Sequence, residues 1–317
     1  MTTFDLTTIG EGQIRLTSHR GDRLGNAREL RMSAACSEAN VSGLLAQLGR
    51  QCSWATILAR GPLAKRILSE YRSAGVDLSN VVRVDEGRVA LYFMEPGEYP
   101  MPARVTYDRE HTPFREMRID QFNWESMLDT KLVFVTGITA ALTENTAKVL
   151  TYFVDQAAER GIKVILDVNY RSMLWGPEDA HRVLDPIARK ASVVFSSRKD
   201  TGIVWGIEGK GAEVSRKLRE ELGVDYVVST DQIAGVYMSG FDTGEREFPV
   251  QQVPVVDRPG AGDSFVGGTI HGYLQGDIAA GVLYGQRTSA YALTHHGDLT
   301  YFSPQELDIP VTTDIVR

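Results

Sequence analysis

Cysteine is nearly absent from this sequence, which has only Cys36 and Cys52 among its 317 residues. Two cysteines are too few for a disulfide framework, and their spacing lacks the second ligand pair that a zinc site would need. We therefore expect both side chains to be small buried thiols. The cysteine content thus excludes a disulfide-stapled scaffold.

The sequence also lacks an excess of positive charge and any long apolar run. Its formal net charge is −7, with acidic and basic residues interspersed, so no basic surface for nucleic acid is expected. The start, 1–5, has neither a basic segment nor a long apolar core, and no later run is long enough to span a bilayer. We expect a cytoplasmic protein that binds neither nucleic acid nor membrane.

Short apolar runs alternate with amphipathic segments along most of the chain. The runs are typical of strands buried on both faces, and the segment 144–160 has a helical apolar stripe followed by Gly161 as a stop. This alternation predicts an α/β fold with a doubly wound, mainly parallel sheet and helices on both faces. Ligands of such sheets bind at the carboxyl ends of the strands. The apolar runs are 132–135, 164–166, 193–195 and 226–228.

Two regions interrupt the alternation, at about 12–30 and 84–116. The first is polar and loop-rich, and the second contains two strand-like runs, 88–94 and 103–107, separated by a turn rich in proline and glycine. Neither region has helices to cover its strands. We interpret the two together as a small β-sheet lid over the main sheet.

The stretch 257–265 combines a phosphate cradle with a candidate base. Gly260, Ala261 and Gly262 read as a turn that opens a helix, whose unpaired N–H groups and positive dipole attract phosphate oxygens. Asp263 follows in the first helical turn, where its carboxylate can take a proton from a hydroxyl that attacks the phosphorus. The alternative is an ordinary loop in which Asp263 is a capping residue.

These nine residues resemble the Asp-Thr-x-Gly-Ala-Gly-Asp-x-Phe signature of the ribokinase-like (PfkB) carbohydrate kinases. Within that family, further stretches fall in an order and at spacings similar to those of 2-keto-3-deoxygluconate kinases, from about residue 9 to 298. The resemblance implies one ribokinase-like kinase domain, 1–317, that uses ATP and Mg²⁺. These further stretches are 10–11, 37–41, 107–109, 136–142 and 167–175.

A sugar acid carries a carboxylate, and guanidinium binds a carboxylate through two parallel charge-assisted bonds. Arg171 follows a predicted buried strand at its carboxyl end, and Arg109 follows a predicted lid strand, so the two could converge on the substrate from opposite sides. Surface ion pairs with local acids are the alternative for both. These acids are Glu178 or Asp179 for Arg171, and Asp108 or Glu110 for Arg109.

Other candidate substrate residues are polar or aromatic. Tyr92 and Tyr107 could supply hydroxyl and stacking contacts from the lid, although aromatic residues in strands also serve packing. The resemblance assigns Asn40 to a sugar hydroxyl, with helix capping as the alternative. It also places Asn169, within the Asp-x-Asn-x-Arg motif, in the substrate site.

The residues before the first helix and those expected to organise magnesium differ from the family pattern. The paired glycines before the first helix are Ala35 and Cys36, so a ligand has less room to approach the backbone. The Asn-x-x-Glu element that organises magnesium becomes Ser197 to Asp200, whose carboxylate is one methylene shorter. Because Mg²⁺ usually keeps several waters, Asp200 could still act on the ion through water.

The residues expected to bind the nucleotide also differ from the family pattern. The family's Gly-x-x-Gly near a late strand becomes a segment with Ser229, Asp231 and Gly235, in which Asp231 places negative charge near phosphates. Pro259 has no N–H to donate, although its fixed φ can pre-set the turn. Arg258 could reach a phosphate or the substrate, or form a surface salt bridge. The preceding residue, 257, could order the loop or line a cation site.

The sequence thus predicts an ATP-dependent kinase that converts 2-keto-3-deoxygluconate to its 6-phosphate, with Asp263 as general base. One alternative is a kinase for another sugar or sugar acid, such as 2-keto-3-deoxygalactonate or 5-keto-2-deoxygluconate, because pocket shape sets the choice of stereochemistry. Another is a sugar-acid-binding relative that does not catalyse. The uncovered lid strands also predict a homo-oligomer, a dimer or a higher even number.

Overall fold

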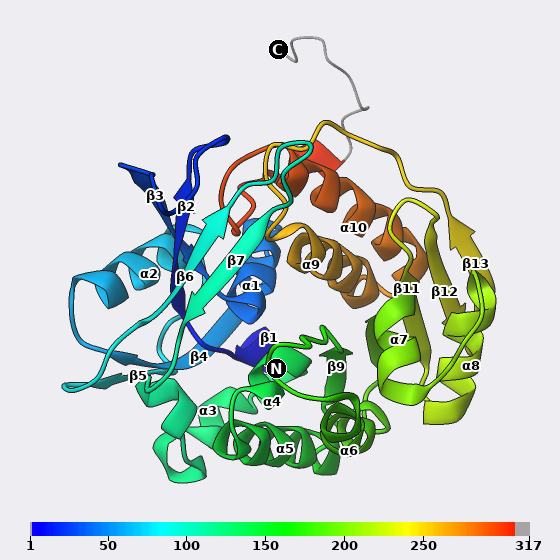
Figure 1. The fold of residues 1–317 in the computed structure, drawn as a ribbon. Coiled ribbons are helices and arrows are strands. Elements are labelled where there is room, and N and C mark those ends of the chain that lie inside the picture. Colours follow the sequence, from blue (N-terminus) through cyan, green and yellow to red (C-terminus); the bar gives the residue numbers. More distant parts are fainter. Residues whose placement is uncertain (1, 308–317) are drawn as a thin grey trace.

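A nine-stranded sheet forms the centre of the protein in the computed structural model, which describes residues 2–307 (Figure 1). Seven neighbouring strands, β5-β4-β1-β8-β9-β10-β11 in sheet order, run parallel. β12 and β13 add an antiparallel hairpin at one edge. The predicted parallel sheet is confirmed, and the four apolar runs lie in β8 to β11. In sheet order the strands are β13 (Gly244–Phe248), β12 (Val236–Gly240), β11 (Tyr226–Thr230), β10 (Val193–Ser197), β9 (Lys163–Asp167), β8 (Thr130–Thr136), β1 (Phe4–Ile9), β4 (Cys52–Ala59) and β5 (Val81–Val84).

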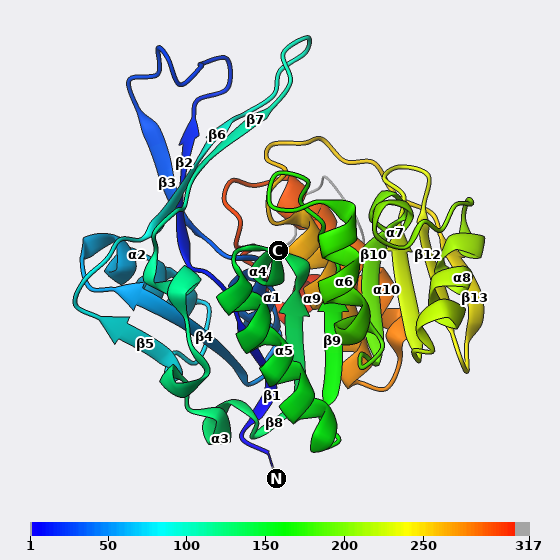
Figure 2. The ribbon, with the colours of Figure 1, turned by 60° about the horizontal axis from the view of Figure 1, so that its bottom comes forward.

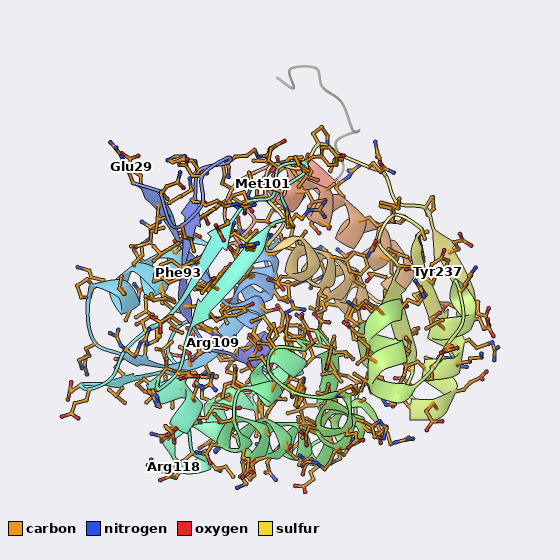
Figure 3. All side chains as sticks on the ribbon, viewed as in Figure 1. Glu29, Phe93, Met101, Arg109, Arg118 and Tyr237 are labelled. Carbon is orange, nitrogen blue, oxygen red and sulfur yellow. The ribbon has the colours of Figure 1, made fainter. Side chains whose placement is uncertain are left out.

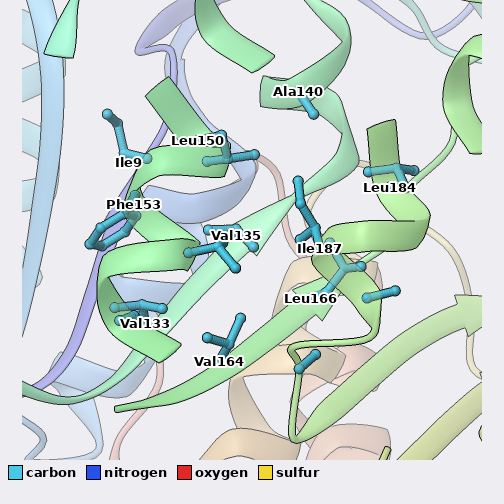
Figure 4. Packing of buried hydrophobic residues seen from close by; sticks show 14 of the residues in the cluster. Ile9, Val133, Val135, Ala140, Leu150, Phe153, Val164, Leu166, Leu184 and Ile187 are labelled. Atoms are coloured by element: carbon cyan, nitrogen blue, oxygen red, sulfur yellow. The ribbon is translucent and has the colours of Figure 1, made fainter. Parts of the chain in front are cut away.

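Helices cover both faces of this sheet, because successive strand side chains point to opposite sides and both sides are apolar. Val133 and Val135 of β8 pack in the core with α5 and α6 (Figure 4), whereas Leu132 and Phe134 pack in the core with α1, α9 and α10. The helices of the first face are α5 (Glu144–Glu159), α6 (Pro177–Ala188), α7 (Arg198–Trp205) and α8 (Ala212–Leu222), and those of the second are α1 (Ser37–Gln47), α9 (Ala261–Leu274) and α10 (Ile278–Leu293).

The helix predicted at 144–160 is confirmed as α5. It starts after Thr143, whose side chain accepts a hydrogen bond from the backbone N–H of Thr146. It ends before Gly161, which has a φ of 70°. The remaining helices are α2 (Pro62–Ser73), α3 (Trp124–Met127), α4 (Gly137–Ala141) and the 3-10 turns Pro113–Glu116, Ile119–Gln121 and Pro304–Leu307.

A second sheet of four strands, the lid sheet, rises from one side of the main sheet (Figure 2). Its order is β3-β2-β6-β7, in which β2 runs parallel to β6 and antiparallel to β3, and β6 and β7 form a hairpin. The small second sheet is confirmed, and its hairpin lies where the two strand-like runs predicted it. The strands are β2 (Gln13–Ser18), β3 (Leu30–Ala35), β6 (Ala90–Glu95) and β7 (Arg104–Asp108).

The first region of the lid sheet contains more strand than its polar, loop-rich sequence indicates. The segment 12–30 includes β2, and β3 carries the sheet on to Ala35. The small residues at the end of β3 give little local strand signal, but Ala34 and Ala35 pair with Ile14 and Gln13 of β2. Pairing with a distant neighbour therefore decides this strand.

Both cysteines are buried free thiols, as expected. Burial raises the pKa of each thiol above its ordinary value. Within residues 2–307, no helix combines the length and the apolar character needed to cross a membrane.

Candidate active site

The turn before α9 leaves no room for a side chain. Gly260 has a φ of 86°, and a Cβ placed on it would lie 2.0 Å from the backbone oxygen of Asp298. Only glycine therefore fits at this position. The 14-residue helix α9 begins at Ala261, whose own N–H donates to the carbonyl of Arg258 across 3.3 Å, so the N–H groups of Gly262 and Asp263 are those that point out of the helix end beside Gly260. This is the geometry expected of an anion cradle.

Asp263 lies in that first turn and is held by two donors from α1. Ser37 Oγ donates to its Oδ1 across 2.5 Å, and Asn40 Nδ2 donates to its Oδ2 across 2.7 Å. Burial raises the pKa of this carboxyl to about 6, while the two hydrogen bonds oppose the rise. The Asp263 carboxylate is therefore anionic at neutral pH and fixed in orientation.

Asn40 has a defined orientation because Tyr71 donates its hydroxyl hydrogen to Asn40 Oδ1 across 2.9 Å. The alternative of helix capping does not apply, because α1 begins at Ser37 with Cys36 as the N-cap. The amide hydrogen bonds instead to Asp263. The expected contact of Asn40 with a sugar hydroxyl stays a prediction.

A second carboxylate, Asp167, stands at the carboxyl end of β9. Its pKa is raised to about 8 by burial and by the negative charge of Asp263, and Arg171 opposes this shift. Asn169 has a φ of 39° and donates from Nδ2 to Asp167 across 3.2 Å and to Ser37 across 3.4 Å. Asn169 of the Asp-x-Asn-x-Arg motif therefore contacts Ser37, which itself holds Asp263.

Arg171 is exposed and its guanidinium pairs with no carboxylate among the described residues. It donates from Nη1 to the carbonyl of Tyr170, whereas Asp179, one of the expected alternative partners, pairs with Arg182. Its positive charge lowers the pKa values of Asp167 and Asp200, so the guanidinium lies near the strand ends. Binding of an anionic ligand by Arg171 stays a prediction.

Arg109 is buried at the end of the lid sheet (Figure 3), and its partner is not one of the expected acids. Its Nε and Nη2 donate to Glu11 Oε2 across 2.9 and 2.6 Å, while Asp108 pairs with Arg88. Because Glu11 lies 98 residues earlier in the chain, the neighbouring sequence could not identify this ion pair. Binding of a substrate carboxylate by Arg109 stays a prediction. Nη1 would make this contact, because Nε and Nη2 already donate to Glu11.

The two lid tyrosines have different environments. Tyr92 is buried and donates its hydroxyl hydrogen to Asp298 Oδ2 across 2.6 Å. Tyr107 is 36% exposed, with its ring 5.8 Å from that of Tyr92 and under the guanidinium carbon of Arg109 at 5.5 Å. Tyr107 is therefore the one of the pair with a face open to a ligand.

The residues expected on the nucleotide side lie in β11, in the turn after it and in the segment before α9. Asp231 pairs with Arg198 at 2.7 Å, so its negative charge is compensated. Ser229 is buried, and its Oγ has no hydrogen-bond partner among the described residues. Gly235 has a φ of 152° next to the Tyr237 ring. Arg258 is exposed beside the Gly260 turn.

Asp200 lies in the first turn of α7, after the N-cap Ser197. Burial raises its pKa, and a hydrogen bond with Ser197 and the charge of Arg171 oppose this. Residues 2–307 contain no group of three or more histidine, cysteine or acidic side chains that could hold a metal ion. A few separated carboxylates suit a magnesium ion that keeps most of its bound waters, because they can hold it through those waters.

Three further residues of this site were missed by the sequence reasoning: Ser37, Asp167 and Arg15. Asp167 had a usable signal, because it ends a buried parallel strand at the edge where ligands bind. Ser37 lies in the stretch 37–41 that resembles the family, but its partner Asp263 is 226 residues away. Arg15 had no such signal, and its partner Asp298 is 283 residues away. The cation beside Asp257 is Arg15, whose Nη2 lies 2.7 Å from Asp257 Oδ1.

Comparison with known proteins agrees with this geometry. The model of the pfkB family of carbohydrate kinases matches residues 4–305. A 2-dehydro-3-deoxygalactonokinase from Haloferax volcanii is 31% identical over 307 residues, covering 96% of each chain. The crystal structure of a 2-dehydro-3-deoxygluconokinase from Thermotoga maritima superposes with a TM-score of 0.89 at 28% identity, again covering 96% of each chain.

The chain belongs to the pfkB family of carbohydrate kinases, and it is therefore a phosphotransferase that acts on a sugar. Kinases of this family use ATP with Mg²⁺. An E. coli protein provisionally assigned as ribokinase II, solved with both ligands, superposes with a TM-score of 0.85 and covers 96% of this chain and 98% of its own. At 16% identity, that likeness shows a shared fold.

Proposed function

We propose that the protein phosphorylates the terminal hydroxyl of a 2-keto-3-deoxy sugar acid at the expense of ATP, with 2-keto-3-deoxygluconate as the first candidate. The observation that carries the proposal is the Asp263 carboxylate, fixed by Ser37 and Asn40 at the end of α9 beside the Gly260 turn. A base and an anion cradle in adjacent residues are what transfer of a phosphoryl group to a hydroxyl requires.

In this mechanism Asp263 accepts the proton of the attacking hydroxyl. Its pKa of about 6 leaves it ionised at pH 7, yet basic enough to receive the proton as the oxygen–phosphorus bond forms. The N–H groups of Gly262 and Asp263, at the positive end of α9, stabilise the charge on the equatorial oxygens. Bound ATP supplies the phosphoryl group, and Mg²⁺ neutralises part of its charge.

We expect the nucleotide and a hydrated metal ion to meet residues from several elements. Ser229 Oγ is a buried polar group without a hydrogen-bond partner among the described residues, and Arg258 is an exposed cation two residues before Gly260. Asp231 no longer opposes a phosphate, because Arg198 neutralises it. Asp200 would hold Mg²⁺ through water.

Arg171 supports an acidic substrate. A carboxylate would neutralise its exposed guanidinium beside Asp167 and Asp200, in a position where a neutral sugar would leave it unpaired. Tyr107, Arg109 and Asn169 would complete the site from the lid sheet and the end of β9. The lid sheet would close over the sugar and exclude water that competes for the phosphoryl group.

The second candidate substrate is 2-keto-3-deoxygalactonate, which differs from the first in the configuration of one hydroxyl. The Haloferax volcanii relative that carries this activity in its name favours it. ATP consumption measured with both acids, with 5-keto-2-deoxygluconate and with neutral sugars separates the candidates through their kcat/KM values. Good turnover of a neutral sugar, with none of any keto-deoxy acid, would reject the substrate class.

Binding of ATP with and without Mg²⁺ distinguishes the kinase from a non-catalytic sugar-acid-binding relative. The kinase should bind ATP, and bind it more tightly with Mg²⁺. Retained affinity for the sugar acid with no measurable nucleotide binding would favour the relative that does not catalyse.

Self-association belongs to the proposal too. Every residue of the edge strand β7 is exposed, including Val105 and Tyr107, so a second copy could pair with this edge. We expect a dimer or a higher even-numbered assembly. A monomeric mass by light scattering at micromolar concentration would contradict this.

A further inference from the structure

Arg15 of β2 is fully buried and forms ion pairs with two carboxylates at once. Its Nη2 lies 2.7 Å from Asp257 Oδ1 and its Nη1 lies 2.7 Å from Asp298 Oδ1. Both acids are buried as well. A buried ion triad of this kind costs desolvation energy, and removal of the central cation would leave two unpaired charges facing each other. Net stabilisation is therefore a weak explanation for the triad.

The two carboxylates belong to the loops that support the phosphate turn. Asp257 stands three residues before Gly260 and accepts hydrogen bonds from the backbone N–H groups of Arg258 and Gly297, at 3.0 and 3.3 Å. Asp298 places its backbone oxygen directly against Gly260. Any shift of either loop must therefore move the N–H groups that would hold the transferring phosphate.

The same triad connects to the sugar side of the lid sheet. Arg15 lies opposite Tyr92 in the register of β2 and β6, and the Tyr92 hydroxyl donates to the second oxygen of Asp298. Tyr92 in turn contacts Tyr107, whose ring faces Arg109. A continuous set of contacts thus runs from the lid residues expected to meet the sugar to the turn expected to meet the phosphate.

We propose that Arg15 is a positioning residue that couples the lid sheet to the phosphate turn, so that the sugar acid and the nucleotide bind cooperatively. This inference rests on the proposed function, because it needs both ligands in the cleft. Arg15 itself touches neither ligand. It acts by fixing Asp257 and Asp298, and closure of the lid sheet on the sugar tightens the turn around the phosphates.

The test compares the Kd of a non-hydrolysable ATP analogue, with Mg²⁺, in the absence and presence of saturating sugar acid. For the natural sequence we expect the sugar acid to tighten nucleotide binding about tenfold. Arg15→Met keeps side-chain length but removes the charge, and should reduce this factor to below about twofold and lower kcat about 10–100-fold. Affinity for the sugar acid alone should change much less.

Two additional variants guard against simple loss of folding. Tyr92→Phe removes only the hydroxyl that joins the lid sheet to Asp298, and should reduce the coupling factor partially without leaving a buried charge unpaired. Arg189→Ala removes an arginine that also bridges two carboxylates, Asp185 and Glu221, but on the exposed surface, and should leave the factor unchanged.

Chemical rescue provides an independent readout. A cavity of about 340 Å³ beside the triad is lined by Arg15, Asp257 and Gly297, so a small cation has a path to the vacated position. Added guanidinium ion should restore part of the kcat of Arg15→Ala, and should not affect Arg189→Ala. A purely structural ion pair would show no such recovery of turnover at equal folded fraction.

The outcomes separate this inference from the proposed function. If the natural protein turns over a sugar acid but binds the two ligands independently, or if Arg15→Met and Tyr92→Phe both keep the full coupling factor, the role of Arg15 is overturned and the kinase function stands. If the natural protein neither binds nor phosphorylates any sugar acid, the proposed function itself fails.

Discussion

The amide of Asn40 donates to the carboxylate of Asp263 across 2.7 Å, so the first helix of the chain holds the candidate base presented by the helix at 261–274. Ser37 holds the other oxygen of the same carboxylate. These two donors favour the ionised form and fix its direction, while burial opposes ionisation. The predicted effects of substitution follow from that balance.

Asp263→Asn should lower kcat about 10²–10⁴-fold, because it keeps the shape of the side chain but removes the base. Affinity for the sugar acid should change little. Steady-state kinetics together with direct binding of the acid check both statements. Asp120→Asn, on the exposed surface, is the matched control and should behave as the natural protein. Near-normal turnover of Asp263→Asn would show that the base is another group.

Ser37→Ala should move the pH dependence of kcat/KM. The hydrogen bond from Ser37 lowers the pKa of Asp263, so its loss should raise this pKa further above about 6. The activity that depends on ionised Asp263 is lost as pH falls through the pKa, and this acid limb should therefore shift upward by about 0.5–1 pH unit. Ser73→Ala, at an exposed position, should leave the limb in place. A limb that moves downward or not at all contradicts the assignment.

Arg171→Ala should chiefly raise the KM for the sugar acid. Loss of charge-assisted bonds to a carboxylate costs roughly 1.5–3 kcal/mol, which corresponds to a loss of kcat/KM of about 10–150-fold. Arg182→Ala removes an exposed arginine that pairs with Asp179, and should have no such effect. Unchanged affinity and selectivity in Arg171→Ala would remove the main physical support for an acidic substrate.

Gly260→Ala should abolish tight nucleotide binding, because a Cβ there meets the backbone oxygen of Asp298 at 2.0 Å and the positive φ disfavours alanine. Gly276→Ala is a sharp control: its φ is 89°, but no atom lies within 4 Å of the added Cβ. Both variants carry the backbone cost of about 1 kcal/mol. Only the first should lose ATP affinity by titration calorimetry, and equal losses in both would argue against a steric role of the Gly260 turn.

Asp167→Asn should stabilise the protein at alkaline pH. The folded-state pKa of Asp167 is raised to about 8, so the stability linked to its bound proton is fully present below about pH 4 and is lost as pH rises through about 8. Asparagine needs no proton, and the free energy of unfolding at pH 8 should rise by about 1–3 kcal/mol. Denaturant unfolding at pH 5 and pH 8 measures this. A gain that is the same at both pH values would show that titration is not its cause.

Local sequence patterns were enough to predict the central strands of the main sheet and the turn that precedes the candidate base. The runs at 132–135, 164–166, 193–195 and 226–228 have the apolar character of strands buried on both faces, and the turn and base at 260–263 are contiguous in sequence. The lid hairpin could be found in the same way, from two strand-like runs around a proline-rich turn.

Partners far apart in the sequence could not be predicted. The pairing of Arg109 with Glu11 spans 98 residues and that of Arg15 with Asp298 spans 283, and each depends on how the lid sheet meets the main sheet. The nearby acids that local reading offers for Arg109 are used elsewhere or remain exposed. Ion-pair choice in this protein is therefore decided by tertiary packing.

The most direct test of the proposed reaction is phosphorus NMR of the product formed from ATP, Mg²⁺ and 2-keto-3-deoxygluconate or its galactonate epimer. We expect a new phosphate ester whose phosphorus couples to the two hydrogens of the terminal carbon, formed by the natural protein and at least about 100-fold more slowly by Asp263→Asn. Release of inorganic phosphate alone, or an ester at any other position, would contradict it.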